Sequence, residues 1–283
     1  MAMQPHHVPV NGVELVYLDQ GRGTPLILVH GSLGDYRTWR RQMGPLSEHY
    51  RVIAYSRRYH YPNTWVGDGT DYSAALHADD LARVIGNLRL GRSHVVASSF
   101  GAYTALVLAM RHPDLVRSLI LGEPPLMPWL QRSVEGQRLA AVFLATAWEP
   151  ARLAFQRGAF AEGIQVFVDG VNGPGTFDRL PPTGRQMLMD NARAMEAETR
   201  AAAHFTPVTC EDVQRITAPV LLLTGELSPQ LFHTITDELE RCVAHPARAV
   251  IEKASHGMHL GNPQAFTQTV LSFLAQQSGH DGA

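Results

Sequence analysis

Cysteine is scarce in this sequence. Cys210 and Cys242 are the two cysteines among 283 residues, and they form no Cys-x-x-Cys motif. Disulfide-rich scaffolds and structural zinc sites both need several cysteines at short spacings, so we expect neither a disulfide framework nor a zinc site. Because lone thiols are typical of reduced compartments, the cysteine usage favours a cytoplasmic protein.

An excess of one charge is also lacking. The 24 Lys and Arg residues nearly balance 26 Asp and Glu residues, which gives a net charge of −2. This balance argues against a nucleic-acid partner or an anionic membrane surface. No stretch approaches the roughly 20 apolar residues of a membrane span, and the first residues lack a signal-peptide pattern. We therefore expect no nucleic-acid or membrane partner, and either a monomer or a homodimer.

What the sequence does contain is a regular alternation of short apolar runs and helical patterns. Strands are expected at 25–29, 51–55, 94–97, 118–121, 220–224 and 248–252, and helices at about 35–48, 73–89, 100–112, 229–243 and 263–276. This alternation predicts a parallel sheet with helices on both faces. Residues 6–10 and 14–18 flank Asn11-Gly12 and predict a β-hairpin that adds an antiparallel edge.

The alternation stops between about Pro124 and Thr217, where the pattern is helical and no buried strand run occurs. A helical block inserted into a parallel sheet predicts a cap over the C-terminal edge of the sheet, where open α/β sheets bind ligands. The expected division is a core of residues 1–123 and 218–283 with a cap of residues 124–217.

The most informative motif is Ala97-Ser98-Ser99-Phe100-Gly101, in which a predicted strand turns directly into a helix. It resembles the nucleophile elbow Gly-x-Ser-x-Gly of the α/β-hydrolase fold, and the resemblance makes Ser99 the candidate nucleophile. Small residues are needed on both sides of the serine because strand and helix press together there. Ala97 departs from the usual glycine by one methyl group. A plain strand–turn–helix junction with capping serines is the alternative interpretation.

Two further stretches add to the resemblance. In Leu28-Val-His-Gly-Ser-Leu-Gly34 an apolar strand ends in His-Gly. In α/β-hydrolases this loop and the elbow supply the oxyanion hole, here the backbone N–H groups of Ser32 and Phe100. Ala254-Ser-His-Gly-Met-His-Leu-Gly-Asn-Pro263 resembles the catalytic-histidine loop of the family, and it makes His256 the candidate general base.

Two other histidines in these loops have structural interpretations. The ring of His30 is expected to brace its loop. His259 lies three residues after His256 and is expected to be structural; a metal site formed by His256 and His259 is the alternative. No third ligand stands in a suitable context, so we expect no metal, and the family resemblance implies no cofactor.

The elbow, the His-Gly loop, the helical block and the histidine loop together cover nearly the whole chain. The sequence is therefore identified as a member of the α/β-hydrolase superfamily. The resemblance implies an α/β protein with a mostly parallel, eight-stranded sheet, helices on both faces and an inserted helical cap. It also implies the chain order nucleophile, acid, histidine.

The acid is not where most family members have it. An Asp usually follows the strand at 220–224, in a pattern like Gly-x-x-Asp, but Gly225-Glu-Leu-Ser228 has a serine there. Serine cannot carry the negative charge that orients the histidine. Glu226 lies at a position that usually points elsewhere, and it is interpreted as a solvated turn residue, although it stays a candidate acid.

A second position for the acid follows the preceding strand. Leu121-Gly-Glu-Pro-Pro125 resembles a subgroup of the superfamily in which the acid lies there, so Glu123 is the expected acid. The two following prolines are expected to keep Glu123 in an extended conformation. A salt bridge at the hinge of the cap is the alternative role for Glu123.

The remaining clues concern the pocket and substrate. Arg57 and Arg58 follow the strand at 51–55, and at least one of them is expected on the surface. The cap segment is rich in large apolar residues: Met127, Trp129, Leu130, Phe143, Trp148, Phe155, Phe160, Phe167 and Phe177. An apolar cleft beneath a cap favours a hydrophobic ester or lactone of medium size.

We therefore expect a cofactor-free serine hydrolase that cleaves such an ester or lactone through an acyl-enzyme. Two alternatives stay open: a hydrolase that cleaves C–C bonds of ring-fission products with the same residues, and a weakly active, receptor-like member that binds a small molecule. Haloalkane dehalogenases and epoxide hydrolases are disfavoured, because they need an Asp where this chain has Ser99.

Overall fold

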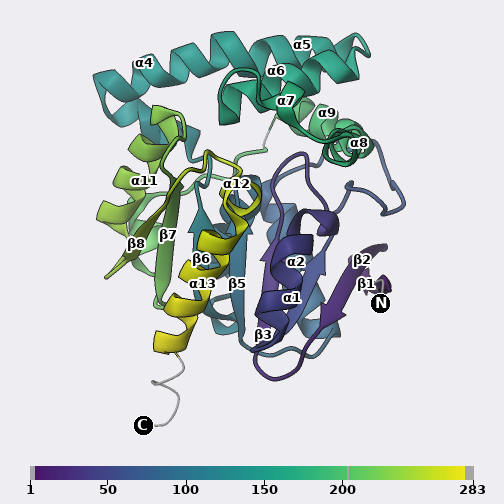
Figure 1. Ribbon diagram of the computed structural model, residues 1–283, viewed down its shortest axis with the longest axis vertical. Coiled ribbons are helices and arrows are strands. Elements are labelled where there is room, and N and C mark those ends of the chain that lie inside the picture. Colours follow the sequence, from purple (N-terminus) through teal and green to yellow (C-terminus); the bar gives the residue numbers. More distant parts are fainter. Residues whose placement is uncertain (1–3, 203, 278–283) are drawn as a thin grey trace.

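The computed structural model describes residues 4–202 and 204–277. At its centre lies an eight-stranded sheet in the order β1-β2-β4-β3-β5-β6-β7-β8 (Figure 1). β1 pairs antiparallel with β2, and β2 with β4, whereas the remaining pairs are parallel. The strands are β1 (His6–Val10), β2 (Val13–Gln20), β3 (Pro25–Val29), β4 (Arg51–Tyr55), β5 (Ser93–Ser98), β6 (Val116–Gly122), β7 (Val220–Gly225) and β8 (Ala247–Ile251).

These strands confirm the alternation predicted from the sequence, including the N-terminal hairpin and its antiparallel edge. β5 and β7 are buried along their whole length, and β3 along all but its first residue. Strands covered on both faces have no solvated side, which is why their central residues are apolar without a polar alternation. The expected helix at 35–48 is split instead: a 3₁₀ turn, η1 (Tyr36–Trp39), precedes α1 (Arg40–Ser47).

Helices cover both faces of the sheet. α1 and α13 (Pro263–Gln277) pack together on one face, over the cluster that includes Leu28, Val96 and Ile120. The helices α2 (Ala74–Asn87), α3 (Phe100–Arg111) and α11 (Gln230–Cys242) contribute buried side chains to the other, larger cluster. Short helices η2 (Pro113–Leu115) and α12 (Met258–Gly261) lie in the connecting loops.

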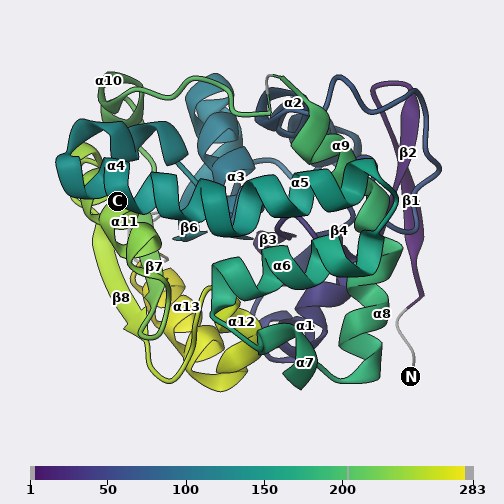
Figure 2. The ribbon, with the colours of Figure 1, turned by 90° about the horizontal axis from the view of Figure 1, so that it is seen from above.

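Between β6 and β7 the chain is helical. We call the segment from η3 to α9 the cap; Figures 1 and 2 show it lying across one end of the sheet. Its elements are η3 (Met127–Arg132), α4 (Val134–Phe143), a π-helical turn η4 (Leu144–Trp148), α5 (Glu149–Gln156), α6 (Phe160–Asn172), α7 (Thr176–Arg179), α8 (Pro182–Asp190) and α9 (Ala192–Arg200). A short α10 (Cys210–Gln214) then leads back to the sheet.

The expectation for the cysteines is wrong. Cys210 and Cys242 form a disulfide, with their Cα atoms 5.1 Å apart. Cys210 begins α10 and Cys242 ends α11, and these two helices pack against each other. A separation of 32 residues gives no local motif, so the pairing depends on tertiary packing alone. With the thiols paired, cysteine usage no longer supports a reduced cytoplasmic setting.

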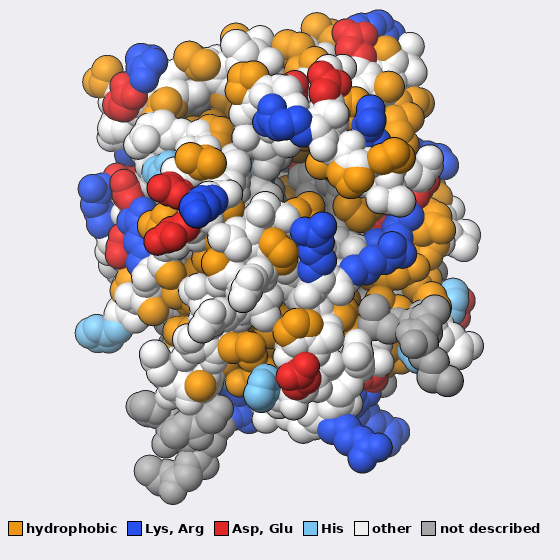
Figure 3. All heavy atoms as spheres, viewed as in Figure 1, with side chains coloured by type: hydrophobic (Ala, Val, Ile, Leu, Met, Phe, Trp, Pro, Cys, Tyr) orange, Lys and Arg blue, Asp and Glu red, His pale blue; other side chains and the backbone are white. Residues whose placement is uncertain are grey.

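The surface reflects the balanced charge. On the face shown in Figure 3, basic and acidic side chains are interspersed with apolar and uncharged ones. Within residues 4–202 and 204–277, none of the helices combines the length and the apolar character needed to cross a membrane.

Candidate active site

Ser99 lies at the corner between β5 and α3. Its backbone has φ +56° and ψ −127°, and its N–H donates to the carbonyl oxygen of Gly122 at 2.7 Å. Residues other than glycine rarely adopt a positive φ, and such strained positions gather at functional sites. The turn leaves Ser99 in the walls of two cavities.

The small residues around Ser99 fit the tight corner. A Cβ atom built on Gly101 would lie 2.4 Å from the carbonyl oxygens of Val29 and His30. Any residue other than glycine would therefore prevent the close approach of the strand and helix backbones. Ala97 is buried and pairs with Val29 on one side and with Leu121 on the other. The sheet thus accommodates the methyl group by which this sequence departs from the usual pattern.

His30 braces the loop that follows β3. The backbone N–H of Arg57 donates to Nε2 of His30 at 2.9 Å. The ring proton is therefore on Nδ1, which donates to the carbonyl oxygen of Gly31 at 2.8 Å. Burial, reinforced by the charge of Arg57, holds the pKa of His30 well below its usual value. The neutral ring ties this loop to the one after β4.

The peptide between Gly31 and Ser32 has a fixed orientation. The Arg57 guanidinium donates to the carbonyl oxygen of Gly31 at 3.0 Å. A trans peptide carries its N–H on the opposite side, so the N–H of Ser32 points away from Arg57. Gly31 lies beside Ser99, because a Cβ atom built on it would be 3.6 Å from the Ser99 Oγ. Phe100 supplies the first N–H of α3, which has no partner within its helix.

His256 is in contact with Glu123. Its Nδ1 lies 2.6 Å from Oε2 of Glu123, and both side chains are buried. The other carboxylate oxygen, Oε1, accepts a hydrogen bond from the backbone N–H of Gly225 at 2.9 Å. The ring of Phe232 stacks on the ring of His256, with 4.0 Å between their centroids. These contacts fix the imidazole plane and leave Nε2 as the nitrogen that faces away from the carboxylate.

The expected extended conformation of Glu123 is wrong. Its φ is +47°, in the left-handed region. Three hydrogen bonds hold this backbone in place: the N–H of Glu123 donates to the carbonyl oxygen of Leu223 at 3.3 Å, and the side chain engages Gly225 and His256. Strain of this kind, typically about 1–3 kcal/mol, persists only where the surroundings over-determine it.

After β7, neither Glu226 nor Ser228 forms a hydrogen bond with His256 in the described part of the chain. Glu226 is exposed, and its Oε2 accepts a hydrogen bond from the backbone N–H of Lys253 at 2.7 Å. This is a turn contact, in agreement with its interpretation from the sequence. Ser228 is buried beside Gly225, and its Oγ finds no partner within the described part of the chain.

A cap residue holds the histidine loop from above. Oδ1 of Asn172, at the end of α6, accepts a hydrogen bond from the N–H of Gly257 at 2.8 Å. Its carbonyl oxygen accepts one from the Ser255 hydroxyl at 2.9 Å. This contact is not evident from the sequence, because a helical pattern does not show which of its polar residues faces another loop.

His259 is buried, and its ring centroid lies 4.7 Å from that of Trp39. Burial is the main cause that lowers the pKa of His259 to about 3, and His256 adds to the shift. Across residues 4–202 and 204–277, no three His, Cys, Asp or Glu side chains are grouped so that they could hold a metal ion.

Neither arginine after β4 lies on the surface, contrary to the expectation for at least one of them. Arg58 forms an ion pair with Asp80 at 2.7 Å. Arg57 is fully buried, and besides Gly31 its guanidinium donates to the carbonyl oxygen of His30 at 3.1 Å and to the hydroxyl of Tyr72 at 3.1 Å. Backbone carbonyl oxygens accept the hydrogen bonds that water would accept from a surface arginine. The sequence does not show that these carbonyl groups lie near Arg57.

Glu198, on cap helix α9, completes this buried network and was not anticipated from the sequence. Its Oε2 accepts a hydrogen bond from the Tyr72 hydroxyl and its Oε1 accepts one from the Ser32 hydroxyl, both at 2.9 Å. Burial is the main cause that raises the pKa of Glu198, and Arg57 partly offsets it. The loop that carries Ser32 is thus held by Arg57 beneath and by the cap above.

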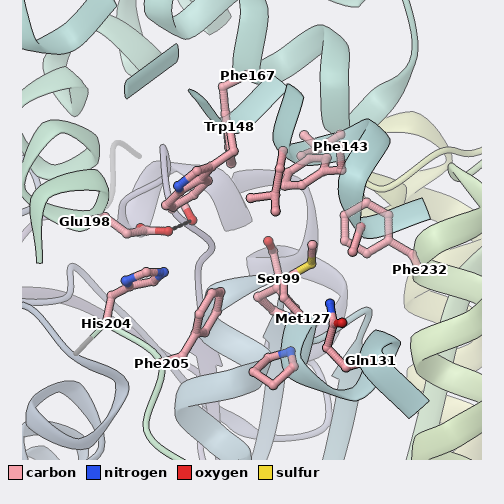
Figure 4. A pocket seen from close by; sticks show the side chains of 16 residues that line it. Ser99, Met127, Gln131, Phe143, Trp148, Phe167, Glu198, His204, Phe205 and Phe232 are labelled. Carbon is pink, nitrogen blue, oxygen red and sulfur yellow. Dashed lines mark hydrogen bonds between the residues drawn. The ribbon is translucent and has the colours of Figure 1, made fainter. Parts of the chain in front are cut away.

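Two cavities meet at Ser99. The large cavity has a volume of about 280 Å³ and lies mainly beneath the cap. Aromatic side chains surround Ser99 there (Figure 4); the lining residues include Phe143, Trp148, Phe167, Phe205 and Phe232. The small cavity, of about 120 Å³, is lined by Ser99, His256, Gly257, Asn172, Met187 and Leu188 among others.

Comparison with known proteins identifies the family. The model of the alpha/beta hydrolase family matches residues 26–269. A curated relative, 2-hydroxymuconate semialdehyde hydrolase from Pseudomonas sp. (strain CF600), is 25% identical, and the match covers 94% of this chain and 92% of that protein.

Two solved structures are similar to this chain in fold. Est816, described as an N-acyl homoserine lactone degrading enzyme, matches with a TM-score of 0.76 and 22% identity over 95% of this chain and 100% of its own. A thermophilic esterase from Thermogutta terrifontis matches with a TM-score of 0.75 and 24% identity over 97% and 99%. Because the family model spans most of the sequence, this chain belongs to the alpha/beta hydrolase family.

Proposed function

We propose that this protein is a serine hydrolase that cleaves a carboxylic ester or lactone of medium size through an acyl-enzyme. Ser99 is the nucleophile, His256 the general base and Glu123 the acid that orients His256. The observation that carries the proposal is the 2.6 Å contact between His256 Nδ1 and Glu123 Oε2, in a chain whose elbow serine and histidine line the same small cavity.

The proposed reaction has two steps. His256 Nε2 takes the proton of Ser99 as its Oγ attacks the carbonyl carbon, and the N–H groups of Ser32 and Phe100 stabilise the negative charge on the carbonyl oxygen. The ester C–O bond breaks, and His256 returns the proton to the departing oxygen. Water activated by His256 then releases the acid. Glu123 holds the proton on Nδ1, which keeps Nε2 available as the base.

The walls of the large cavity support a hydrophobic substrate. Aromatic and aliphatic cap residues make up most of them, and an apolar pocket with few polar groups favours a compact apolar ligand. In this proposal the cap belongs to an inserted domain of residues 124–217, which covers a core domain of residues 1–123 and 218–283. No metal or cofactor takes part.

A C–C bond hydrolase is the second candidate. The relative from Pseudomonas acts, by its name, on 2-hydroxymuconate semialdehyde, and the same residues could serve such a reaction. The similar esterase and lactone-degrading structures favour the first candidate. A receptor-like member was an alternative because Ser228 replaces the usual acid, and the contact of Glu123 with His256 weakens that argument.

The test combines turnover with labelling of the serine. We expect the protein to hydrolyse short-chain p-nitrophenyl esters, and a fluorophosphonate to label it covalently, with both activities lost in Ser99→Ala. Ser98→Ala is the matched control, because Ser98 is the neighbouring buried serine at the end of β5. No labelling of the parent protein at neutral pH would contradict the proposed function.

A further inference from the structure

The two cavities at Ser99 differ in which other proposed catalytic residue they contain. Ser32 and Ser99 line both. His256 lines the small cavity and is not among the lining residues of the large one, where Phe232 covers the face of its ring. The reaction centre therefore has one side with the histidine and one side without it.

This difference between the two cavities indicates which cavity holds the acyl half of an ester and which holds the alcohol half. When the tetrahedral intermediate collapses, the C–O bond to the alcohol breaks and the alcohol oxygen takes the proton that His256 received from Ser99. The leaving oxygen must consequently lie on the side of His256. The acyl carbon stays bonded to Ser99 Oγ, and the rest of the acyl group extends to the other side.

We propose that the acyl group of the substrate occupies the large cavity and that a short alcohol leaves through the small one. This inference rests on the proposed function and specifies the orientation of the ester. The substrate has a bulky, apolar acyl group and a small alcohol. The volumes agree with it, since the large cavity has about 280 Å³ and the small cavity about 120 Å³. A neighbouring surface cavity shares Asn172, Met187 and Leu188 with the small one, which gives the alcohol a route outward.

The walls of the large cavity also determine the charge of the acyl group. Among the described residues that line it, none is Lys or Arg. Glu198, labelled in Figure 4, contributes a carboxyl group that accepts a hydrogen bond from the Ser32 hydroxyl. His204, which also lines the cavity, has Nδ1 2.9 Å from the carbonyl oxygen of Ala201, so this nitrogen donates to that carbonyl oxygen and is not available to a substrate carboxylate. A substrate carboxylate would be buried there without a Lys or Arg partner, which is strongly unfavourable.

The acyl group should therefore be neutral as well as apolar. This separates the protein from hydrolases whose substrates carry a carboxylate on the acyl side. It also gives Glu198 a role in specificity besides its contact with Ser32, because a second carboxylate in the same cavity would add repulsion to the cost of burial.

Two isomeric esters test the orientation. Ethyl hexanoate and hexyl acetate have the same atoms and nearly the same polarity, but the six-carbon chain is on the acyl side in the first and on the alcohol side in the second. We expect kcat/KM for ethyl hexanoate to exceed that for hexyl acetate by about 10-fold or more, as for a few methylene groups placed in a fitting pocket. Equal values, or a preference for hexyl acetate, would overturn the assignment.

A charged analogue tests the second part. Monoethyl adipate carries a carboxylate at the end of the same acyl chain, and we expect its kcat/KM to be about 100-fold below that of ethyl hexanoate. Gln131→Arg places a cation in the wall of the large cavity, since Gln131 lines it, and should raise the adipate-to-hexanoate ratio about 10-fold. Gln137→Arg adds the same charge at an exposed position of α4 that is not part of the wall, and should leave the ratio unchanged.

The outcomes separate this inference from the proposed function. If a fluorophosphonate labels Ser99 but hexyl acetate or monoethyl adipate is the better substrate, the orientation or the neutrality of the acyl group is wrong while the serine hydrolase stands. If both ethyl hexanoate and hexyl acetate fail despite labelling, the assigned substrate class is wrong. If labelling fails too, both proposals fall.

Discussion

The carboxylate of Glu123 lies 2.6 Å from Nδ1 of His256, although 133 positions separate the two residues in the chain. Glu123 follows β6 and His256 follows β8, with β7 between them in the sheet. Gly225, the last residue of β7, donates its N–H to the same carboxylate at 2.9 Å. The end of the strand after which most family members have their acid thus helps to hold the residue that contacts the histidine.

Arg57 is expected to position the loop that carries the proposed oxyanion donor Ser32. Arg57→Lys removes the forked contact to the carbonyl oxygens of His30 and Gly31 while keeping the charge. Losing one oxyanion donor typically costs about 10²–10³-fold in rate, so a misaligned donor should lower kcat by about 10–100-fold with a small change in KM. Steady-state kinetics with a p-nitrophenyl ester measure this.

Arg58→Lys is the matched control for Arg57→Lys. It also alters a buried arginine, but Arg58 pairs with Asp80 and does not contact Gly31 in any hydrogen bond formed by the described residues. We expect it to lower stability and leave kcat within about threefold of the parent, since the proposed catalytic residues keep their contacts. Similar losses of kcat in both variants, in proportion to their loss of stability, would show that Arg57 is only structural.

Gly101 is expected to be irreplaceable for packing. In Gly101→Ala the new methyl carbon would be 2.4 Å from the backbone carbonyl oxygens of Val29 and His30, so strand and helix must separate. Overpacking of this kind costs about 1–3 kcal/mol or more. In Gly86→Ala, by contrast, nothing lies within 4 Å of the new atom, and a helical Gly→Ala change should stabilise α2 by about 0.5–1 kcal/mol. Urea denaturation compares the two.

His77 should make the protein less stable in mild acid. It is buried, both of its ring nitrogens lack a hydrogen-bond partner within the described residues, and burial holds its pKa well below the usual value. The unfolded chain binds a proton below about pH 6.5 that the folded protein does not bind, so the free energy of unfolding falls as pH falls, by up to about 1.4 kcal/mol per pH unit.

In His77→Leu this contribution disappears. The difference in the free energy of unfolding between the variant and the parent should shift in favour of the variant by about 1.4 kcal/mol for each pH unit below about 6.5. Denaturant titrations at pH 7, 6 and 5 measure the difference. A constant difference across these pH values would mean that His77 takes up a proton in the folded protein as readily as in the unfolded chain, which would contradict the lowered pKa.

The fold was largely predictable because its central strands are buried on both faces. Pro25–Val29 is entirely apolar and Val220–Gly225 is apolar through Leu223, so neither run has an alternating polar face, and the elbow and histidine motifs are local. Glu123 was proposed as the acid from its proline-rich neighbourhood, but its left-handed φ was not predicted. That conformation depends on three hydrogen bonds to residues at least 100 positions away.

Other features depended entirely on packing. The Cys210–Cys242 disulfide exists because α10 and α11 lie side by side. Arg57 is buried because two backbone carbonyls and Tyr72 accept its N–H groups. Glu198 is one of several polar residues on α9, and the helical pattern does not show that it reaches Ser32. The residues next to these positions in the sequence do not show which distant residues they contact in the fold.

The most direct test of the account is the turnover of Glu123→Gln beside that of Glu226→Gln. Gln keeps the shape of each side chain and removes the charge that holds the proton on His256 Nδ1. We expect Glu123→Gln to lose about 10²–10⁴-fold in kcat with an unchanged thermal midpoint, and Glu226→Gln, whose exposed carboxylate bonds the N–H of Lys253, to match the parent. Parental turnover in Glu123→Gln, or a comparable loss in Glu226→Gln, would contradict the assignment of the acid to Glu123.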